Sequence, residues 1–128
     1  MLIPNNCKEI DLYVLLNKFF SSEFINFNTI CEKCHKKTQQ IKITKFAIMS
    51  KILIISLQRF DFRNNLKNDC QIKFDEFIDI NKFIDDDLLN EKIIFKLFGI
   101  IKHFGDIISG HYVSYINLKI CMNLMITM

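Results

Sequence analysis

Two short stretches of this sequence carry side chains with types and spacing suited to chemistry. The first is CEKC, in which Cys31 and Cys34 are separated by two residues. Thiolates at this spacing can bind one tetrahedral ion, because the turn between them directs both sulfurs to the same side. A structural zinc site usually has four protein ligands, so this pair predicts half of a Zn²⁺ site. The alternative is a pair of ordinary turn cysteines, since half a site has little metal affinity alone. No organic cofactor is expected.

The other cysteines, Cys7, Cys70 and Cys121, have no partner at this spacing. Five cysteines without a secretory signal make a disulfide framework improbable, so reduced thiols or metal ligands are expected. His35 follows the thiol pair directly, and CEKCH also matches covalent haem attachment. That attachment normally needs an exported chain, which the N-terminal sequence does not indicate.

The second stretch holds His103 and Gly105, followed closely by Gly110-His111-Tyr112. A histidine just after a glycine, at the start of a strand, projects from the mouth of a loop. His111 can then act as a general base, because an unperturbed histidine has a pKa of about 6.5. The alternative is a histidine that caps a strand end and is satisfied by a backbone group.

The elements that position these residues are predicted from periodicity. Residues 10–20 place leucine and phenylalanine on one helical face. Residues 40–46 alternate as a half-exposed strand does, and the Ile-rich run at 51–60 indicates a strand buried on both faces.

Two more strands, at 92–104 and 111–118, flank a hairpin-like loop over 105–110 with a glycine at each end. Residues 29–38 form a polar turn, 63–70 a polar connection and 71–84 a mixed segment, while the tail from 119 has no usable pattern. One helix followed by strands predicts an α+β fold with a mostly antiparallel sheet.

Composition narrows the class of protein. The chain has 128 residues, of which 50% are hydrophobic and 24% are charged, so it can build a core and is not disordered. The longest apolar run is far shorter than the roughly 20 residues of a membrane span. The net charge of +3 is spread along the chain, so neither nucleic acid nor membrane is an expected partner. Export is not expected, which places the protein inside the cell, in cytoplasm or nucleus.

Taken together, these stretches resemble the ubiquitin-specific protease family of cysteine deubiquitinases. The similar parts occur in the family's order over about residues 8–117. They are a helix ending KFFSSEF, the CEKC pair, the apolar strand ILIISLQRFDF, the segment from Phe74 to Ile80, and LFGIIKHFGDIISGHYVSYI.

The resemblance implies a partial papain-like peptidase fold of fingers and palm without the thumb. Residues 1–118 would be a partial catalytic domain, with fingers to about residue 50, palm over 51–118, and an unmatched tail at 119–128. Cys31 and Cys34 would be one pair of a zinc ribbon, and His111 would be the catalytic base. Phe60, Gly110 and Tyr112 would lie at the cleft that admits the C-terminal tail of ubiquitin. The aromatic rings could equally be core packing.

The departures from the family pattern are as informative as the matches. The family's catalytic cysteine stands in an N-terminal box that this sequence does not contain, and the first CxxC pair is also missing. The family's orienting Asp or Asn has no match here, since Asn117 and Asn123 stand in a different context. General-base help adds only about 10²–10⁴-fold to a reaction that still needs a nucleophile. We therefore expect the chain alone to be inactive.

Three functional hypotheses remain. The chain is part of a deubiquitinating thiol protease, or it is a non-catalytic module that binds ubiquitin or ubiquitinated proteins. A small zinc-knuckle protein would explain only the CEKC pair. We also expect poor solubility, because a palm without its thumb would expose apolar sheet.

Overall fold

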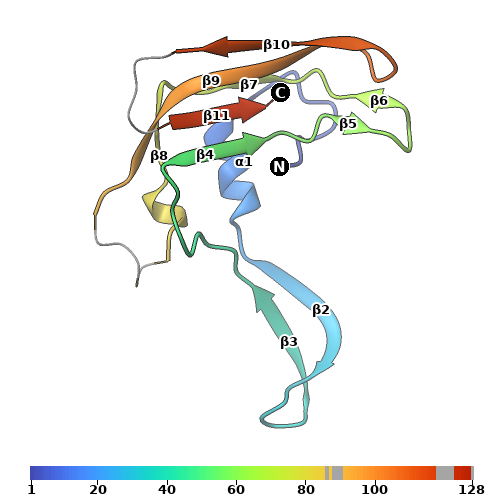
Figure 1. The fold of residues 1–128 in the computed structure, drawn as a ribbon. Coiled ribbons are helices and arrows are strands. Elements are labelled where there is room, and N and C mark those ends of the chain that lie inside the picture. Colours follow the sequence, from blue (N-terminus) through green and yellow to red (C-terminus); the bar gives the residue numbers. More distant parts are fainter. Residues whose placement is uncertain (86, 88–90, 118–122, 128) are drawn as a thin grey trace.

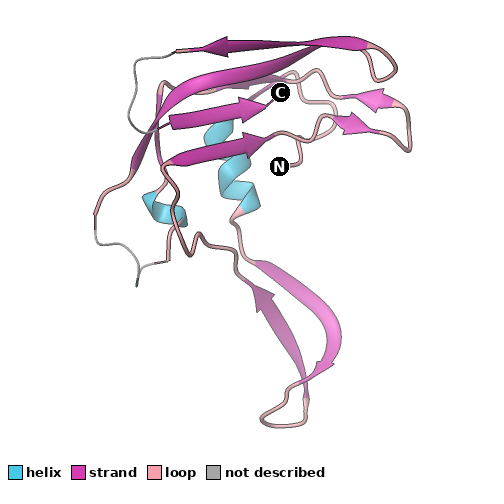
Figure 2. Cartoon of the chain, in the orientation of Figure 1, coloured by secondary structure: helices cyan, strands magenta, loops and turns pink. Residues whose placement is uncertain are grey.

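A mixed β-sheet forms the body of the molecule in the computed structural model, which describes residues 1–85, 87, 91–117 and 123–127 (Figure 1). Four strands lie in the order β10-β9-β11-β4, and β8 pairs with the first part of β9. Their bounds are β4 Ile52–Ser56, β8 Phe77–Asp79, β9 Ile94–Gly105, β10 Gly110–Ile116 and β11 Asn123–Thr127. β8 and β10 run antiparallel to β9, whereas β11 runs parallel to both β4 and β9. The α+β class is confirmed, and strands outnumber helices among the described residues (Figure 2).

Strand β11 is the element of the main sheet that the sequence pattern left without an assignment. It comes from the tail yet lies between β4 and β9, where Ile126 pairs with Ile55 on one side and Ile100 on the other. Ile126 is completely buried. A strand of five residues without a turn signal has too little pattern to be identified, although its pairing partners make it central to the sheet.

The helix α1 (Leu12–Phe19) covers one face of this sheet (Figure 1). Asp11 begins it by accepting a 2.6 Å hydrogen bond from the backbone N–H of Tyr13, the N-cap arrangement that satisfies a free donor. The predicted apolar face is confirmed for three leucines, which are buried, but Phe19 is about half exposed. Phe20, directly after the helix, packs against the rings of Phe46 and Phe83 beside the core.

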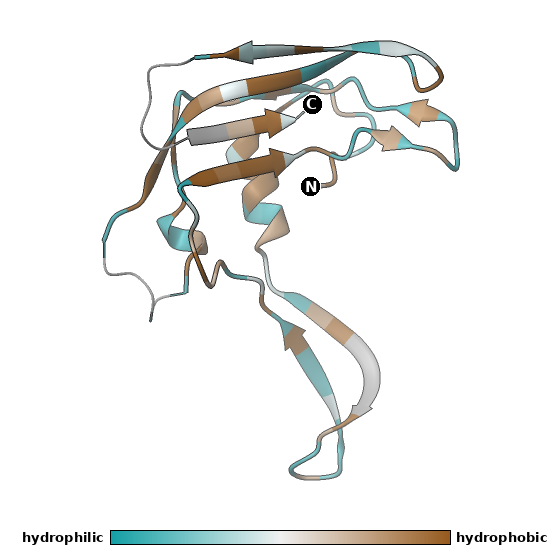
Figure 3. Cartoon of the chain, in the orientation of Figure 1, coloured by the Kyte–Doolittle hydropathy of each residue, from teal (hydrophilic) through white to brown (hydrophobic). Residues whose placement is uncertain are grey.

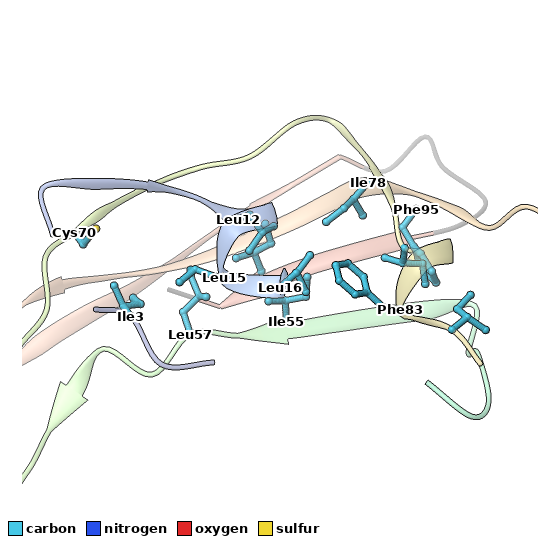
Figure 4. Packing of buried hydrophobic residues seen from close by; sticks show 13 residues of the cluster. Ile3, Leu12, Leu15, Leu16, Ile55, Leu57, Cys70, Ile78, Phe83 and Phe95 are labelled. Atoms are coloured by element: carbon cyan, nitrogen blue, oxygen red, sulfur yellow. The ribbon is translucent and has the colours of Figure 1, made fainter. Parts of the chain in front are cut away.

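The core lies between α1 and the inner face of the sheet (Figure 4). Its thirteen buried residues come from segments far apart in the sequence: Ile3, Leu12, Leu15, Leu16, Ile55, Leu57, Cys70, Ile78, Ile80, Phe83, Ile84, Phe95 and Ile126. Phe83 belongs to a short 3-10 helix, η1 (Asn81–Phe83), inside the mixed segment predicted at 71–84. Burial of apolar surface, at about 25 cal/mol per Å², is the main force that holds these segments together.

The outer face of strand β4 differs from expectation. The run at 51–60 was predicted to be buried on both faces, but only Ile55 and Leu57 are buried, whereas Ile52 and Ile54 are exposed. The hydropathy of the strand is high throughout (Figure 3), so its composition does not reveal which side faces solvent. Helix α1 covers only one face of the sheet, so the β4 side chains on the other face stay exposed.

A second correction concerns Cys7 and Cys70, which were expected to be reduced. The structure joins them in a disulfide with Cα atoms 5.3 Å apart. Each cysteine lies just before one of two short parallel strands, β1 (Glu9–Asp11) and β7 (Gln71–Lys73), which pair from Glu9 opposite Gln71. The disulfide therefore connects the start of the chain to the segment before β7.

Two hairpins extend from the body. The first consists of β2 (Glu23–Ile30) and β3 (Lys37–Lys42) and projects away from the sheet (Figure 1). The sequence pattern placed a strand at 40–46, three residues late, and missed β2. The second consists of β5 (Phe60–Asp61) and β6 (Leu66–Lys67), of which only β6 lies in the polar connection predicted at 63–70. The predicted division of fingers from palm near residue 50 stays a prediction, as does the boundary of the tail.

No helix in the described part of the chain is long and apolar enough to cross a membrane.

Candidate functional site

His111 lies at the start of β10, immediately after the loop that joins β9 to β10. Antiparallel pairing sets His111 opposite Phe104 and Tyr112 opposite His103. The His111 side chain is exposed, and it has no hydrogen-bond partner among the described residues. Its imidazole is thus open to solvent and to a bound group, as a general base requires.

The loop before His111 is held by a side chain of its own. Asp106 accepts hydrogen bonds from the backbone N–H groups of Ile108 and Ser109, each at 3.0 Å. These bonds favour the charged carboxylate, so they hold the pKa of Asp106 below its usual value. Gly105, with a φ of 107°, turns the chain into the loop in a conformation that other residues rarely adopt. The loop before His111 therefore adopts a defined turn.

Gly110 is required by a close approach rather than by an unusual φ. A Cβ atom at this position would lie 2.1 Å from Nε2 of His103 and 2.4 Å from the backbone oxygen of Phe104. Neither distance is compatible with a real contact between non-bonded atoms. The glycine before His111 thus lets the His103 ring pack against the backbone of β10 on one face of the paired strands.

Replacing Gly110 with alanine is expected to destabilise the hairpin and displace His111. The methyl group would overlap both a side chain and a backbone atom, and overpacking of this kind typically costs about 1–3 kcal/mol. Urea unfolding followed by circular dichroism measures the loss. Ser109→Ala is the matched control, because it changes a neighbouring exposed side chain by one atom. Equal stability of the two variants would contradict the close packing at Gly110.

An aromatic cluster forms around His103. The ring of Phe60 meets it edge-on at a centroid distance of 5.1 Å, and the ring of Tyr112 lies 4.7 Å away at a tilt of 53°. Phe62 stacks on Phe60 at a centroid distance of 6.0 Å. The structure thus brings together Phe60, Gly110 and Tyr112, which the resemblance assigned to one cleft. Their contact with a substrate stays a prediction.

Two polar contacts connect the β5–β6 hairpin to its surroundings. The ammonium of Lys67 donates to the backbone oxygen of Gly105, at the base of the loop before His111, and lies 3.3 Å from Asp69. The Arg59 guanidinium donates to the backbone oxygens of Asn68 and Cys70, at 2.7 and 2.8 Å. Sequence reasoning missed the role of Lys67, because a lysine in a polar stretch has no distinguishing pattern.

The CEKC pair forms the turn of the β2–β3 hairpin. The backbone N–H groups of Cys34 and Lys33 donate to the Cys31 sulfur, and these bonds lower the pKa of its thiol. The turn closes through a 2.7 Å bond from the N–H of His35 to the backbone oxygen of Cys31, and His35 adopts a positive φ of 53°. Backbone donors that stabilise a thiolate suit a metal ligand, since the thiolate is the form that binds metal. Within the described residues no group of three or more ligand-type side chains is assembled, so zinc stays a prediction.

The thiols lie away from His111. Figure 1 shows the turn of the β2–β3 hairpin at the opposite end of the molecule from β10. Cys7 and Cys70 are bonded to each other, and Cys121 lies outside the described residues. Among the described cysteines, therefore, none is placed to receive help from His111.

The candidates for an orienting residue are also remote. Asn117 follows the far end of β10, six residues from His111, which corresponds to about 20 Å along an extended strand. Asn123 pairs with Lys96 in β9, eight residues from Phe104, the residue opposite His111. Both positions agree with the expectation that neither asparagine serves the histidine.

Comparison with known proteins reveals clear relatives. A profile of the ubiquitin carboxyl-terminal hydrolase family matches residues 11–121. A probable ubiquitin carboxyl-terminal hydrolase of Acanthamoeba polyphaga mimivirus is 28% identical over 123 residues, covering 91% of this chain and 26% of the relative. Ubiquitin carboxyl-terminal hydrolase 25 of Arabidopsis thaliana is 36% identical over 104 residues, covering 79% of this chain and 16% of the relative. The chain thus spans 26% and 16% of the length of these two relatives.

A solved structure is similar over most of the chain. It is the SAGA Ubp8/Sgf11/Sus1/Sgf73 DUB module bound to ubiquitin aldehyde, with a TM-score of 0.67 and 27% identity. The match covers 92% of this chain and 28% of the solved one.

Proposed function

Because this chain belongs to the ubiquitin carboxyl-terminal hydrolase family, we propose that it is the histidine-bearing part of a thiol protease that cleaves the isopeptide bond at the C-terminal glycine of ubiquitin. The observation that carries the proposal is the placement of His111. Its exposed imidazole follows a glycine that admits no side chain, and the next residue, Tyr112, belongs to the aromatic cluster with Phe60 and His103. A tail ending in two glycines is narrow enough to pass beside such rings.

The chemistry assigned to His111 is general-base catalysis. Its imidazole takes the proton of an attacking thiol, the thiolate attacks the glycine carbonyl, and the imidazolium then protonates the departing lysine amine. A thioester links ubiquitin to the enzyme until water, activated by the same imidazole, releases it. In this scheme the thiol nucleophile comes from outside the described residues, because the described thiols lie away from His111.

The proposal is tested by turnover and binding measured on the same chain. With a fluorogenic ubiquitin substrate we expect no hydrolysis by the chain alone. With isotope-labelled chain and unlabelled ubiquitin we expect saturable shifts at His111 and Tyr112. Ubiquitin that lacks its two C-terminal glycines is the matched control, and it should shift these signals far less.

Two outcomes would contradict the proposal. Cysteine-dependent hydrolysis by the chain alone would mean that one of its own thiols is the nucleophile. Identical shifts with intact and truncated ubiquitin would mean that the surface around His111 does not receive the tail.

A second candidate function is a non-catalytic module that binds ubiquitin or ubiquitinated proteins. The distance between the described thiols and His111 favours it. The two candidates differ in what a supplied nucleophile would do. If adding the cysteine-bearing part of a related enzyme produces turnover that His111→Gln removes, the protease proposal holds. Ubiquitin binding that never leads to turnover favours the binding module.

We further propose that Cys31 and Cys34 bind a structural Zn²⁺ as half of a ligand set. The backbone bonds to the Cys31 sulfur support this, because they stabilise the thiolate before the metal binds.

Replacing both Cys31 and Cys34 with serine is expected to abolish zinc binding, which a colorimetric zinc assay on the denatured chain measures. Glu32→Gln is the matched control, because it changes the same turn and leaves both thiols in place. Zinc that remains bound to the double variant would mean that the metal is held elsewhere.

We propose that the protein is localised inside the cell, in the cytoplasm or the nucleus, because ubiquitin-modified substrates are found there.

A further inference from the structure

We propose that His103 is a positioning residue that holds the backbone on both sides of His111, and through it the general base. The inference rests on the proposed function only for the role of His111. What His103 does to its neighbours follows from the contacts of the fold alone.

The His103 ring touches the residues on either side of His111. Before it stands Gly110, whose missing Cβ would lie within 2.1 Å of the ring nitrogen Nε2 and 2.4 Å of Cε1. After it stands Tyr112, whose ring centroid is 4.7 Å from that of His103. One flat ring therefore restrains the first and third residues of Gly110-His111-Tyr112.

Strand geometry explains why the contacts of the His103 ring leave the His111 side chain uncovered. Gly105 pairs with Gly110, and His103 pairs with Tyr112 across the hairpin. Side chains of directly opposed residues share a face, and successive residues alternate between faces. His103, Gly110 and Tyr112 thus occupy one face of β9–β10, while His111 and its partner Phe104 project from the other. The contact orients the base without covering it.

The ring is itself held by packing. Phe60 from the β5–β6 hairpin closes one side of it, edge-on at 5.1 Å. Its Nδ1 is buried and finds no hydrogen-bond partner among the described residues, so shape rather than a polar bond fixes it there. Lys67 adds a second link between the same hairpins through the backbone oxygen of Gly105. His103 is thus the point at which the β5–β6 hairpin supports the segment that carries His111.

The test is hydrogen exchange and histidine NMR on the whole chain without ubiquitin, so its result does not depend on the proposed activity. In His103→Ala we expect amide exchange at Gly110, His111 and Tyr112 to rise at least tenfold, with exchange in β4 and β11 within twofold of the parent. The ring signal of His111 should shift and broaden. His35→Ala is the matched control, because it removes a histidine from the distant β2–β3 turn.

Two further variants keep the test decisive. His103→Phe retains a flat ring without nitrogens and should restore protection to within threefold of the parent. Phe60→Leu leaves the β9–β10 hairpin unchanged but removes the ring that supports His103, so exchange at Tyr112 should rise three- to tenfold. The proposal is overturned if His103→Ala leaves the His111 signals unchanged, or if exchange rises equally in all strands, which would indicate a general contribution to stability.

Discussion

Replacing Ile126 with aspartate is expected to abolish cooperative folding. Ile126 has no exposed surface, and its strand β11 lies between β4 and β9 in the middle of the sheet. Losing a buried isoleucine costs about 2–5 kcal/mol. A carboxyl group without partners adds several kcal/mol more, because it must be desolvated or protonated. Since a small domain is stable by only about 5–15 kcal/mol, this change should leave no thermal transition in circular dichroism.

The matched control for this prediction is Ile54→Asp. It introduces the same side chain into the neighbouring strand, but at a position that is 62% exposed. We expect it to lower the free energy of unfolding by less than about 1 kcal/mol, as most exposed substitutions do. If Ile126→Asp melts as sharply as the parent, β11 does not occupy the centre of the sheet.

Reducing the disulfide between Cys7 and Cys70 is the second change with a large expected effect. The two residues are 63 positions apart in the chain. A cross-link that closes a loop of this size restricts the unfolded chain and contributes about 4 kcal/mol in the chain-entropy model. For a domain of this length, that corresponds to a drop in Tm on the order of 15 °C.

The measurement uses a variant in which Cys31, Cys34 and Cys121 are replaced by serine, so that only one pairing is possible. Its melting temperature is compared with and without dithiothreitol. A further Cys7→Ser replacement is the control, and it should melt at the reduced temperature under both conditions. Identical melting of the oxidised and reduced chain would show that the disulfide contributes nothing to stability.

The disulfide also bears on the site. Arg59 donates hydrogen bonds to the backbone oxygens of Asn68 and Cys70, so it holds the segment that carries one end of the disulfide. Arg59 precedes Phe60, the ring that supports His103. A chain of covalent and polar contacts therefore connects the first residues of the protein to the aromatic cluster beside His111.

The sequence by itself determined the features that depend on local pattern. The leucines of residues 10–20 recur at helical spacing, and the helix is found at Leu12–Phe19. Two strand candidates and a loop with a glycine at each end predicted the hairpin of β9 and β10. The string that ends in Gly110-His111-Tyr112 and the order of the other similar stretches pointed to the family by resemblance.

Only the tertiary structure decided which segments meet. Strand β11 has too weak a pattern to be predicted, yet its partners β4 and β9 make it the centre of the sheet. The spacing of Cys7 and Cys70 carries no signal, because their sulfurs meet only after β1 pairs with β7. The His103 ring likewise gains its role from Phe60, 43 positions away in the printed sequence. Periodicity reports on neighbours within a few residues, whereas these contacts depend on how distant strands come together.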